Sequence, residues 1–202
     1  MSPPGLYRLK PFSQLIVEPI AAGLARRGVS PDLLSALALP VAAAGGLCIG
    51  LSGSVPALLL AVPVLAAARI VLNLLDGMVA RSTGQAHPMG EMWNELGDRA
   101  CDVFFIGGLA FAPGVEPRLV LGGLAAALLA SYAGITARAA GGTRQYTGVM
   151  SKPGRMIVLG VAAPLAFLTG SATWLQVAAG AILLGGLVTL AQRVMAAGRE
   201  LD

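Results

Sequence analysis

Apolar runs of about 20 residues recur along the whole length of this 202-residue chain, and each is long enough to cross a bilayer as a helix. The chain is 56% hydrophobic and 12% charged, against roughly 25% charged in soluble domains. Its mean hydropathy is +0.77. Six spans would use about 120 residues, so no room remains for a second, soluble domain. The pattern excludes an ordinary water-soluble protein and predicts a single membrane domain over residues 1–202.

The predicted fold is all-α, an integral membrane protein with six transmembrane helices preceded by an interfacial amphipathic helix. The spans are expected at 32–52, 56–81, 90–112, 117–139, 154–170 and 172–195, so that the bundle occupies 32–195. Ser30 and Pro31 have the residue types of an N-cap and a first helical position. Residues 6–27 mix apolar and charged side chains, which predicts a helix lying in the membrane interface and bent near Pro19.

Basic residues lie almost entirely on one side of the predicted membrane. They precede the first span, follow the sixth, and occupy the connections between spans two and three and between spans four and five. On the other side only Arg118 is present. By the positive-inside rule, both termini are expected in the cytoplasm, in a multi-pass protein of the inner (cytoplasmic) membrane.

An acidic cluster lies where spans two and three should meet the cytoplasmic face. Five of the ten acidic residues fall within residues 76–102, namely Asp76, Glu91, Glu95, Asp98 and Asp102. Carboxylates at this depth are unfavourable unless they are paired or bind a cation, which indicates a functional site. Asn73 and Asp76 share one helix face, as do Asn94 and Asp98. A hairpin turning over 82–89 would join these faces into an oxygen-rich site for a hard divalent cation such as Mg²⁺.

Small residues lie beside these carboxylates. Gly77, Ala80 and Gly90 present little or no side chain, so a flat or bulky ligand could press against the backbone there. A cation site beside such a pocket suits a nucleotide diphosphate better than a bare ion.

The string Asp76-Gly77-x-x-Ala80-Arg81-x8-Gly90-x3-Asn94-x3-Asp98 resembles the signature of the CDP-alcohol phosphatidyltransferases. The resemblance implies a six-helix membrane enzyme of phospholipid biosynthesis that uses CDP-diacylglycerol as donor. It implies one or two ions of Mg²⁺ or Mn²⁺ held by Asp76, Asp98, Asn73 and Asn94, and Asp98 as the catalytic base. It also implies donor contacts by Gly77, Ala80 and Gly90, and a homodimer. Arg81 either holds the donor or pairs with a motif acid. No nucleic-acid partner is expected.

The chain departs from the family signature at two positions. Asn73 and Asn94 stand where the family has its first and third aspartates, a variation that resembles a bacterial subgroup with both asparagines. An asparagine offers a neutral carbonyl oxygen, so four formal charges become two and metal binding is less favourable. Arg69 lies one turn deeper than Asn73 on the same helix face. Either Arg69 has a structural partner, or it holds a donor phosphate oxygen in place of a lost metal charge.

A basic group marks the longest cytoplasmic connection. Arg138, Arg144, Lys152 and Arg155 surround it, and Arg193 follows in the last span. The positive-inside rule alone could account for these residues, or they could form an anion pocket for a phosphorylated acceptor. Arg138, Arg155 and Arg193 resemble residues that hold inositol phosphate in the phosphatidylinositol-phosphate synthase branch. That branch usually has a lysine where this chain has Thr136.

Three functions are compatible with these features. The leading hypothesis is transfer of a phosphatidyl group from CDP-diacylglycerol to a small, anionic alcohol acceptor, with release of CMP. A family member that binds CDP-lipid without turnover is the second, because two motif carboxylates are missing. A cation transporter is the third, disfavoured by the nucleotide-compatible glycines and by the lack of a visible inverted repeat.

Overall fold

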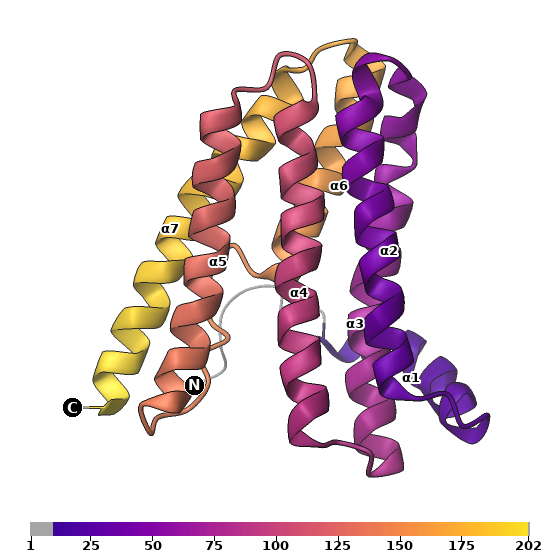
Figure 1. The fold of residues 1–202 in the computed structure, drawn as a ribbon, viewed down its shortest axis with the longest axis vertical. Coiled ribbons are helices and arrows are strands. Elements are labelled where there is room, and N and C mark those ends of the chain that lie inside the picture. Colours follow the sequence, from indigo (N-terminus) through magenta and orange to yellow (C-terminus); the bar gives the residue numbers. More distant parts are fainter. Residues whose placement is uncertain (1–9, 202) are drawn as a thin grey trace.

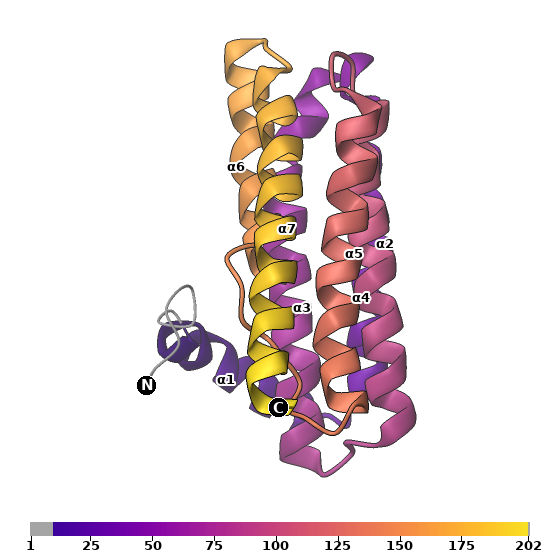
Figure 2. The same cartoon turned by 90° about the vertical axis from the view of Figure 1, so that its left-hand side faces the viewer.

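The computed structural model describes residues 10–201, in which seven α-helices and three short 3-10 turns occur and no strand is found. The helices are α1 (Lys10–Arg26), α2 (Pro31–Gly50), α3 (Val62–Thr83), α4 (Pro88–Gly108), α5 (Pro117–Ala139), α6 (Lys152–Thr169) and α7 (Thr173–Leu201). Helices α2 to α7 run along one common long axis as a bundle (Figures 1 and 2).

Four helical segments of the described chain are long and apolar enough to cross a membrane. They are Pro31–Gly53, Pro56–Thr83, Pro117–Ala139 and Thr173–Leu201. The other two long helices, α4 and α6, pack in the same bundle but contain charged residues. The chain is therefore an all-α multi-pass membrane protein. Every predicted span has a helix at its position, and the crossing of the membrane by α4 and α6 stays a prediction.

Helix α1 occupies most of the segment predicted to be amphipathic, 6–27, of which residues 6–9 lie outside the described chain. It contains Pro19 and packs on α3. It projects sideways from one end of the bundle (Figure 2), which we call the α1 end. The turn between α3 and α4 and the C-terminal end of α7 lie at this same end, and the segment 140–151 runs from it to the middle of the bundle, where α6 begins (Figure 1). The interfacial position of α1 stays a prediction.

Local caps explain where the helices begin and end. The Ser30 hydroxyl accepts a hydrogen bond from the Leu33 amide at 3.2 Å, and Pro31 is the first residue of α2, as predicted. Between α3 and α4, Gly84 adopts a φ of 67°, which closes α3 in a left-handed cap. His87 then caps α4, because its Nδ1 accepts from the Gly90 amide at 3.0 Å. The α3–α4 hairpin is therefore tight, and its turn needs only residues 84–87.

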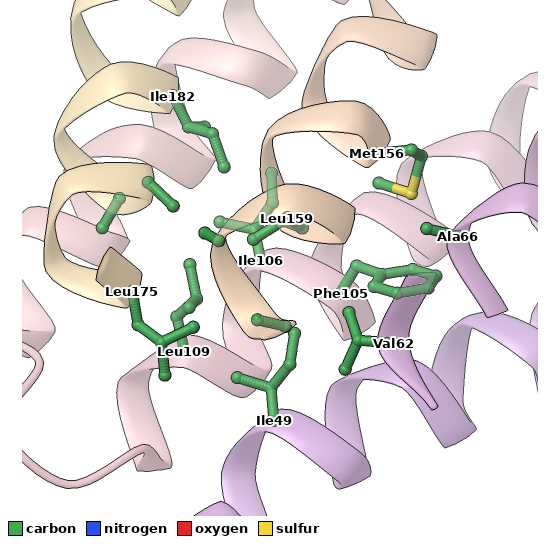
Figure 3. Close-up of a cluster of buried hydrophobic side chains, with 14 of the residues drawn as sticks. Ile49, Val62, Ala66, Phe105, Ile106, Leu109, Met156, Leu159, Leu175 and Ile182 are labelled. Carbon is green, nitrogen blue, oxygen red and sulfur yellow. The ribbon is translucent and has the colours of Figure 1, made fainter. Parts of the chain in front are cut away.

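The far end of the bundle is packed by apolar side chains and by close backbone contact. Phe105, Leu109 and Leu159 are fully buried in the central cluster (Figure 3). A Cβ on Gly46 would collide with the Phe104 carbonyl, and one on Gly108 would collide with the backbone of Gly46. Helices α2 and α4 thus cross in backbone contact, as small residues allow in lipid.

Candidate active site

Asp76 of α3 is buried and receives its hydrogen bonds from neutral groups. Its Oδ2 accepts from the Ser35 hydroxyl at 2.8 Å and from the Asn94 amide at 3.2 Å. Its Oδ1 accepts from the Gly77 amide at 2.5 Å. Side chains of α2, α3 and α4 therefore meet at this carboxylate, and the predicted convergence of the α3 and α4 motif faces is confirmed.

Asp98 of α4 is equally buried but is surrounded by cations. Its Oδ1 accepts from the Arg69 guanidinium and, at 3.2 Å, from the Asn73 amide. Its Oδ2 accepts from the Lys152 ammonium, which comes from the first residue of α6. Arg69 thus has the structural partner that the first interpretation required. Lys152, which we predicted as an acceptor residue, contacts the motif carboxylate Asp98, and its role toward the acceptor stays a prediction.

A small cavity of about 40 Å³ adjoins this cluster. Its polar wall contains Arg69, Asn73, Asp102 and Lys152, and its remaining wall is apolar: Ile70, Leu74, Pro153 and Met156. A space of this size holds a few waters at most, so a diphosphate needs side chains of the wall to move aside.

The four motif residues do not fit a pair of divalent ions. Both oxygens of Asp76 and both oxygens of Asp98 already accept hydrogen bonds from protein groups. The amides of Asn73 and Asn94 donate to these carboxylates, so their nitrogens and not their oxygens face the cluster. Within residues 10–201, no three His, Cys, Asp or Glu side chains gather in a way that could hold a metal ion.

Four acidic residues form a stripe along one face of α4. We call this set the acidic stripe. Its members, spaced by four, three and four residues, are Glu91, Glu95, Asp98 and Asp102. Each carboxylate has a basic partner from elsewhere in the fold. Glu91 pairs with Arg138, Glu95 with Arg144, Asp98 with Lys152 and Arg69, and Asp102 with Arg155. The stripe therefore joins α4 to α3, to the end of α5 and to the start of α6.

The outer half of the stripe faces the candidate acceptor residues. Arg138 is exposed on Glu91, whereas Arg144 is half-buried between Glu91 and Glu95 and stacks 4.8 Å from the centre of the Tyr146 ring. Burial by itself would lower the pKa of Arg144, but the hydrogen bond and the charge of Glu95 raise that pKa above its ordinary value. Arg144 is therefore a permanent cation at the α1 end.

The two other candidate acceptor residues lie deeper. Arg155 is buried and donates to both oxygens of Asp102, at 3.2 and 2.7 Å, and to the Met150 carbonyl at 3.1 Å. Arg193 of α7 donates to the Thr147 and Ala130 carbonyls at 2.9 and 2.7 Å. Both side chains thus hold the segment 140–151 against the bundle.

The remaining motif residues line the α1 end of α3 and α4. Gly77 lies beside Arg81, which is exposed and forms no ion pair with the described side chains. Gly90 leaves space for His87 and Asp32, because its Cβ would lie 3.0 Å from His87 Nε2 and 3.2 Å from Asp32 Oδ1. The glycine at 90 therefore also serves the α3–α4 turn, a role that the motif alone does not reveal. Ala80 is half-buried on the same helix.

Two residues of the site were missed in the sequence. Ser35 donates to Asp76 from α2, and its only signal was a hydroxyl near the start of the first span. Arg99 links Glu95, at 2.7 Å, to the Ser131 hydroxyl of α5, at 2.5 Å. Its spacing of four from Glu95 could have indicated that pair. Glu95 lies on the same helix face as Asp98, and its two oxygens accept hydrogen bonds from Arg99 and Arg144.

No family model matches the chain. It is 31% identical over 156 residues to the inner membrane protein YnbA of Escherichia coli, covering 77% of each chain. It is 33% identical over 153 residues to the archaetidylinositol phosphate synthase of Aeropyrum pernix, covering 75% of this chain and 76% of that one. It is 28% identical over 200 residues to the phosphatidylinositol phosphate synthase of Streptomyces avermitilis, covering 94% and 80%.

Solved structures share the fold. The phosphatidylinositol phosphate synthase of Mycobacterium tuberculosis with CDP-DAG bound has a TM-score of 0.76 and 24% identity, covering 92% of this chain and 94% of that one. The same synthase in complex with manganese and citrate has a TM-score of 0.75 and 24% identity, covering 91% and 90%. With the motif residues gathered on α3 and α4, these likenesses have one reading: the chain belongs to the CDP-alcohol phosphatidyltransferase family.

Proposed function

We propose that this chain transfers the phosphatidyl group of CDP-diacylglycerol to the hydroxyl of a small, anionic alcohol and releases CMP, as a step of phospholipid biosynthesis. The observation that carries the proposal is the meeting of the two motif carboxylates, Asp76 and Asp98, in one buried cluster between α3 and α4. The relatives named archaetidylinositol phosphate synthase and phosphatidylinositol phosphate synthase support an anionic acceptor.

In the proposed reaction the acceptor oxygen attacks the phosphorus that carries diacylglycerol. A bond forms between these two atoms, and the bond from that phosphorus to the oxygen of the CMP group breaks, so that CMP leaves with the electron pair. The proton of the acceptor hydroxyl passes to Asp98, the proposed general base. Because both Asp98 oxygens accept hydrogen bonds from cations, one of these bonds must be released before the carboxylate can take a proton.

The residues around the cluster divide into a donor side and an acceptor side. On the donor side Arg81 is an exposed cation, and Gly77, Ala80 and Gly90 leave room beside it. On the acceptor side Arg138 and Arg144 could exchange Glu91 and Glu95 for an acceptor phosphate, because this pair of arginines lies at the rim. The burial of Arg155 and the carbonyl partners of Arg193 favour positioning roles for these two.

The placement of the chain in the cell follows from the same reasoning. We infer that the α1 end faces the cytoplasm, because the basic residues gather there. The Escherichia coli relative named as an inner membrane protein supports a location in the cytoplasmic membrane. A homodimer remains an expectation from the family, to be tested by the mass of the purified protein in detergent.

The test is release of CMP from CDP-diacylglycerol by the purified protein across a panel of alcohols. The panel contains glycerol 3-phosphate, inositol phosphate, inositol and serine, each with Mg²⁺, with Mn²⁺ and with EDTA. We expect acceptor-dependent CMP with a phosphorylated alcohol and a loss of at least about 100-fold in Asp98→Asn, as is typical when a general base is removed. Arg118→Met, which removes an exposed charge at the opposite end of α5, is the matched control and should keep full activity.

One observation favours a second function, a CDP-lipid-binding protein without turnover. Both oxygens of the proposed base are occupied, and two family carboxylates are replaced by Asn73 and Asn94. If CDP-diacylglycerol binds but no acceptor yields CMP, this second function replaces the first.

A further inference from the structure

The Asp98 cluster contains two protein cations where the family signature leads one to expect metal ions. Arg69 and Lys152 both contact Asp98, one through each carboxylate oxygen. With Asp76 and Asp98 as the two carboxylates, the formal charge of the four side chains is already zero. Two divalent ions would add four positive charges next to two existing ones. The further carboxylate in the cavity wall, Asp102, is already paired with Arg155.

The two asparagines fit this arrangement. Asn73 donates its amide to Asp98 Oδ1, the same oxygen that Arg69 contacts, and Asn94 donates to Asp76. Ammonium, guanidinium and amide groups all donate hydrogen bonds, whereas a metal ion needs oxygen lone pairs. The departures from the signature at 73 and 94 and the two cations therefore act together, since each replaces a metal-binding feature with a hydrogen-bond donor.

Lys152 stands at a position where a cation is unfavourable for the helix itself. It is the first residue of α6, where the helix dipole contributes a positive partial charge of about half a unit. Its side chain is 28% exposed, whereas that of Asp98 is 3% exposed. A lysine that opposes the helix dipole, partly open and beside a cavity shared with Arg69, is suited to move from Asp98 to an entering anion.

Resting on the proposed function, we propose that Arg69 and Lys152 together hold the diphosphate of the CDP-lipid in place of divalent ions, so that this chain binds its donor and turns it over without metal. Arg69 provides a fixed, buried guanidinium with several N–H donors. Lys152 shifts from Asp98 Oδ2 to a phosphate oxygen as the donor enters, and this shift frees the oxygen that the proposed proton transfer requires. The cation pair also stabilises the negative charge on the leaving CMP.

The experiment measures donor binding and metal binding separately from turnover. Full-length protein in lipid nanodiscs is stripped of metal with EDTA, and binding of CDP-diacylglycerol is measured with and without added Mn²⁺. Binding of Mn²⁺ is followed by loss of its free-ion electron paramagnetic resonance signal. We expect CDP-diacylglycerol affinities within about twofold in the two conditions, and no stoichiometric binding of Mn²⁺.

Variants assign the effect to Lys152. Lys152→Met should weaken metal-free donor binding by about 10- to 100-fold, the range for losing a hydrogen bond to a charged group. Lys152→Arg should retain most of the affinity, and Arg118→Met should change nothing. A triple variant, Asn73→Asp with Asn94→Asp and Lys152→Met, should gain Mn²⁺ binding. A circular dichroism spectrum of each variant verifies the helix content.

The outcomes separate this proposal from the proposed function. Donor binding or CMP release that EDTA abolishes and Mn²⁺ restores, with one or two Mn²⁺ bound, overturns the cation pair and leaves the transferase intact. Metal-free binding that depends on Lys152, without CMP from any acceptor, keeps the cation pair as the donor site but overturns metal-free turnover together with the transferase. Absence of donor binding in every condition contradicts both.

Discussion

Asp98 and Asp102 lie one turn apart on α4 and differ in what holds them. Each is about 3% exposed, and each pairs with a basic residue from the first turn of α6, Lys152 or Arg155. Arg155, the partner of Asp102, is itself 2% exposed and donates a further hydrogen bond to the Met150 carbonyl. Lys152, a partner of Asp98, is 28% exposed. Asp98 also accepts a hydrogen bond from Arg69, and the small cavity lined by Arg69 and Lys152 lies beside it.

The difference teaches how one helix face serves two purposes. A buried pair in which every donor is satisfied fastens α4 to α6 and leaves no group free to act on a ligand. A pair with one partly exposed partner tolerates exchange, because the carboxylate keeps a second cation while the first moves. Asp102 and Arg155 thus have a structural role, whereas for Asp98 and Lys152 we propose a role in the reaction.

Removing the fixed partner should have the largest effect on stability. Arg155→Met leaves the Asp102 carboxylate buried beside Arg99 alone, whose nearest nitrogen is 3.7 Å away. We expect a loss of about 3–5 kcal/mol in the free energy of unfolding, the range for breaking a buried ion pair. Thermal unfolding followed by circular dichroism in detergent measures the loss.

The matched control removes both charges. Arg155→Met with Asp102→Leu should recover most of the lost stability, because a well-packed apolar pair often replaces a buried ion pair without penalty. A double variant as unstable as the single one would show that the arginine acts through the Met150 carbonyl and not through Asp102.

Removing the partly exposed partner, Lys152, should change stability much less. Lys152→Met leaves Asp98 with Arg69 and Asn73, and Lys152 is partly exposed, so solvent screens its charge. We expect a loss of about 1 kcal/mol or less in the same unfolding experiment. A loss of unfolding free energy equal to that of Arg155→Met would contradict the proposed difference between the Asp98–Lys152 and Asp102–Arg155 pairs.

The outermost turn of the acidic stripe should show the smallest effect. Glu91 and Arg138 are 49% and 59% exposed, so Glu91→Gln should lower the unfolding free energy by no more than about 0.5 kcal/mol. Glu95→Gln should lower the unfolding free energy more than Glu91→Gln does, since Glu95 accepts hydrogen bonds from both Arg99 and Arg144. The series from 91 to 102 then measures how the value of an ion pair rises with burial along one helix. Equal losses at 91 and 95 would contradict this order.

Local sequence spacing predicted those parts of the site that depend on a single hairpin. The helix positions, the cap at Ser30 and the convergence of Asp76 and Asp98 followed from apolar runs, capping residues and a three-to-four-residue period. Spacing indicates which residues share one face of a helix. A short turn then determines which face of the next helix in the chain lies opposite.

The rest depended on helices distant in the chain. Lys152 and Arg155 follow a connection of about a dozen residues, and nothing in their spacing tells which face of α4 the start of α6 will contact. The same holds for Ser35, which reaches Asp76 only because α2 packs between α3 and α4. Asn73 and Asn94 were expected to offer oxygens to a metal, but the direction of an amide is decided by its partners in the folded state.

The backbone contact between Gly46 and α4 has a mechanical consequence for the distant site. Ser35 lies eleven positions before Gly46 on the same helix, about 16 Å along its axis. A tilt of α2 about the glycine contact would therefore move Ser35, which donates a hydrogen bond to Asp76. A side chain at 46 that tilts α2 by about 5° would displace Ser35 by about 1.4 Å over that length, enough to break its 2.8 Å hydrogen bond. The geometry around Asp76 is thus sensitive to volume changes at the far end of the bundle.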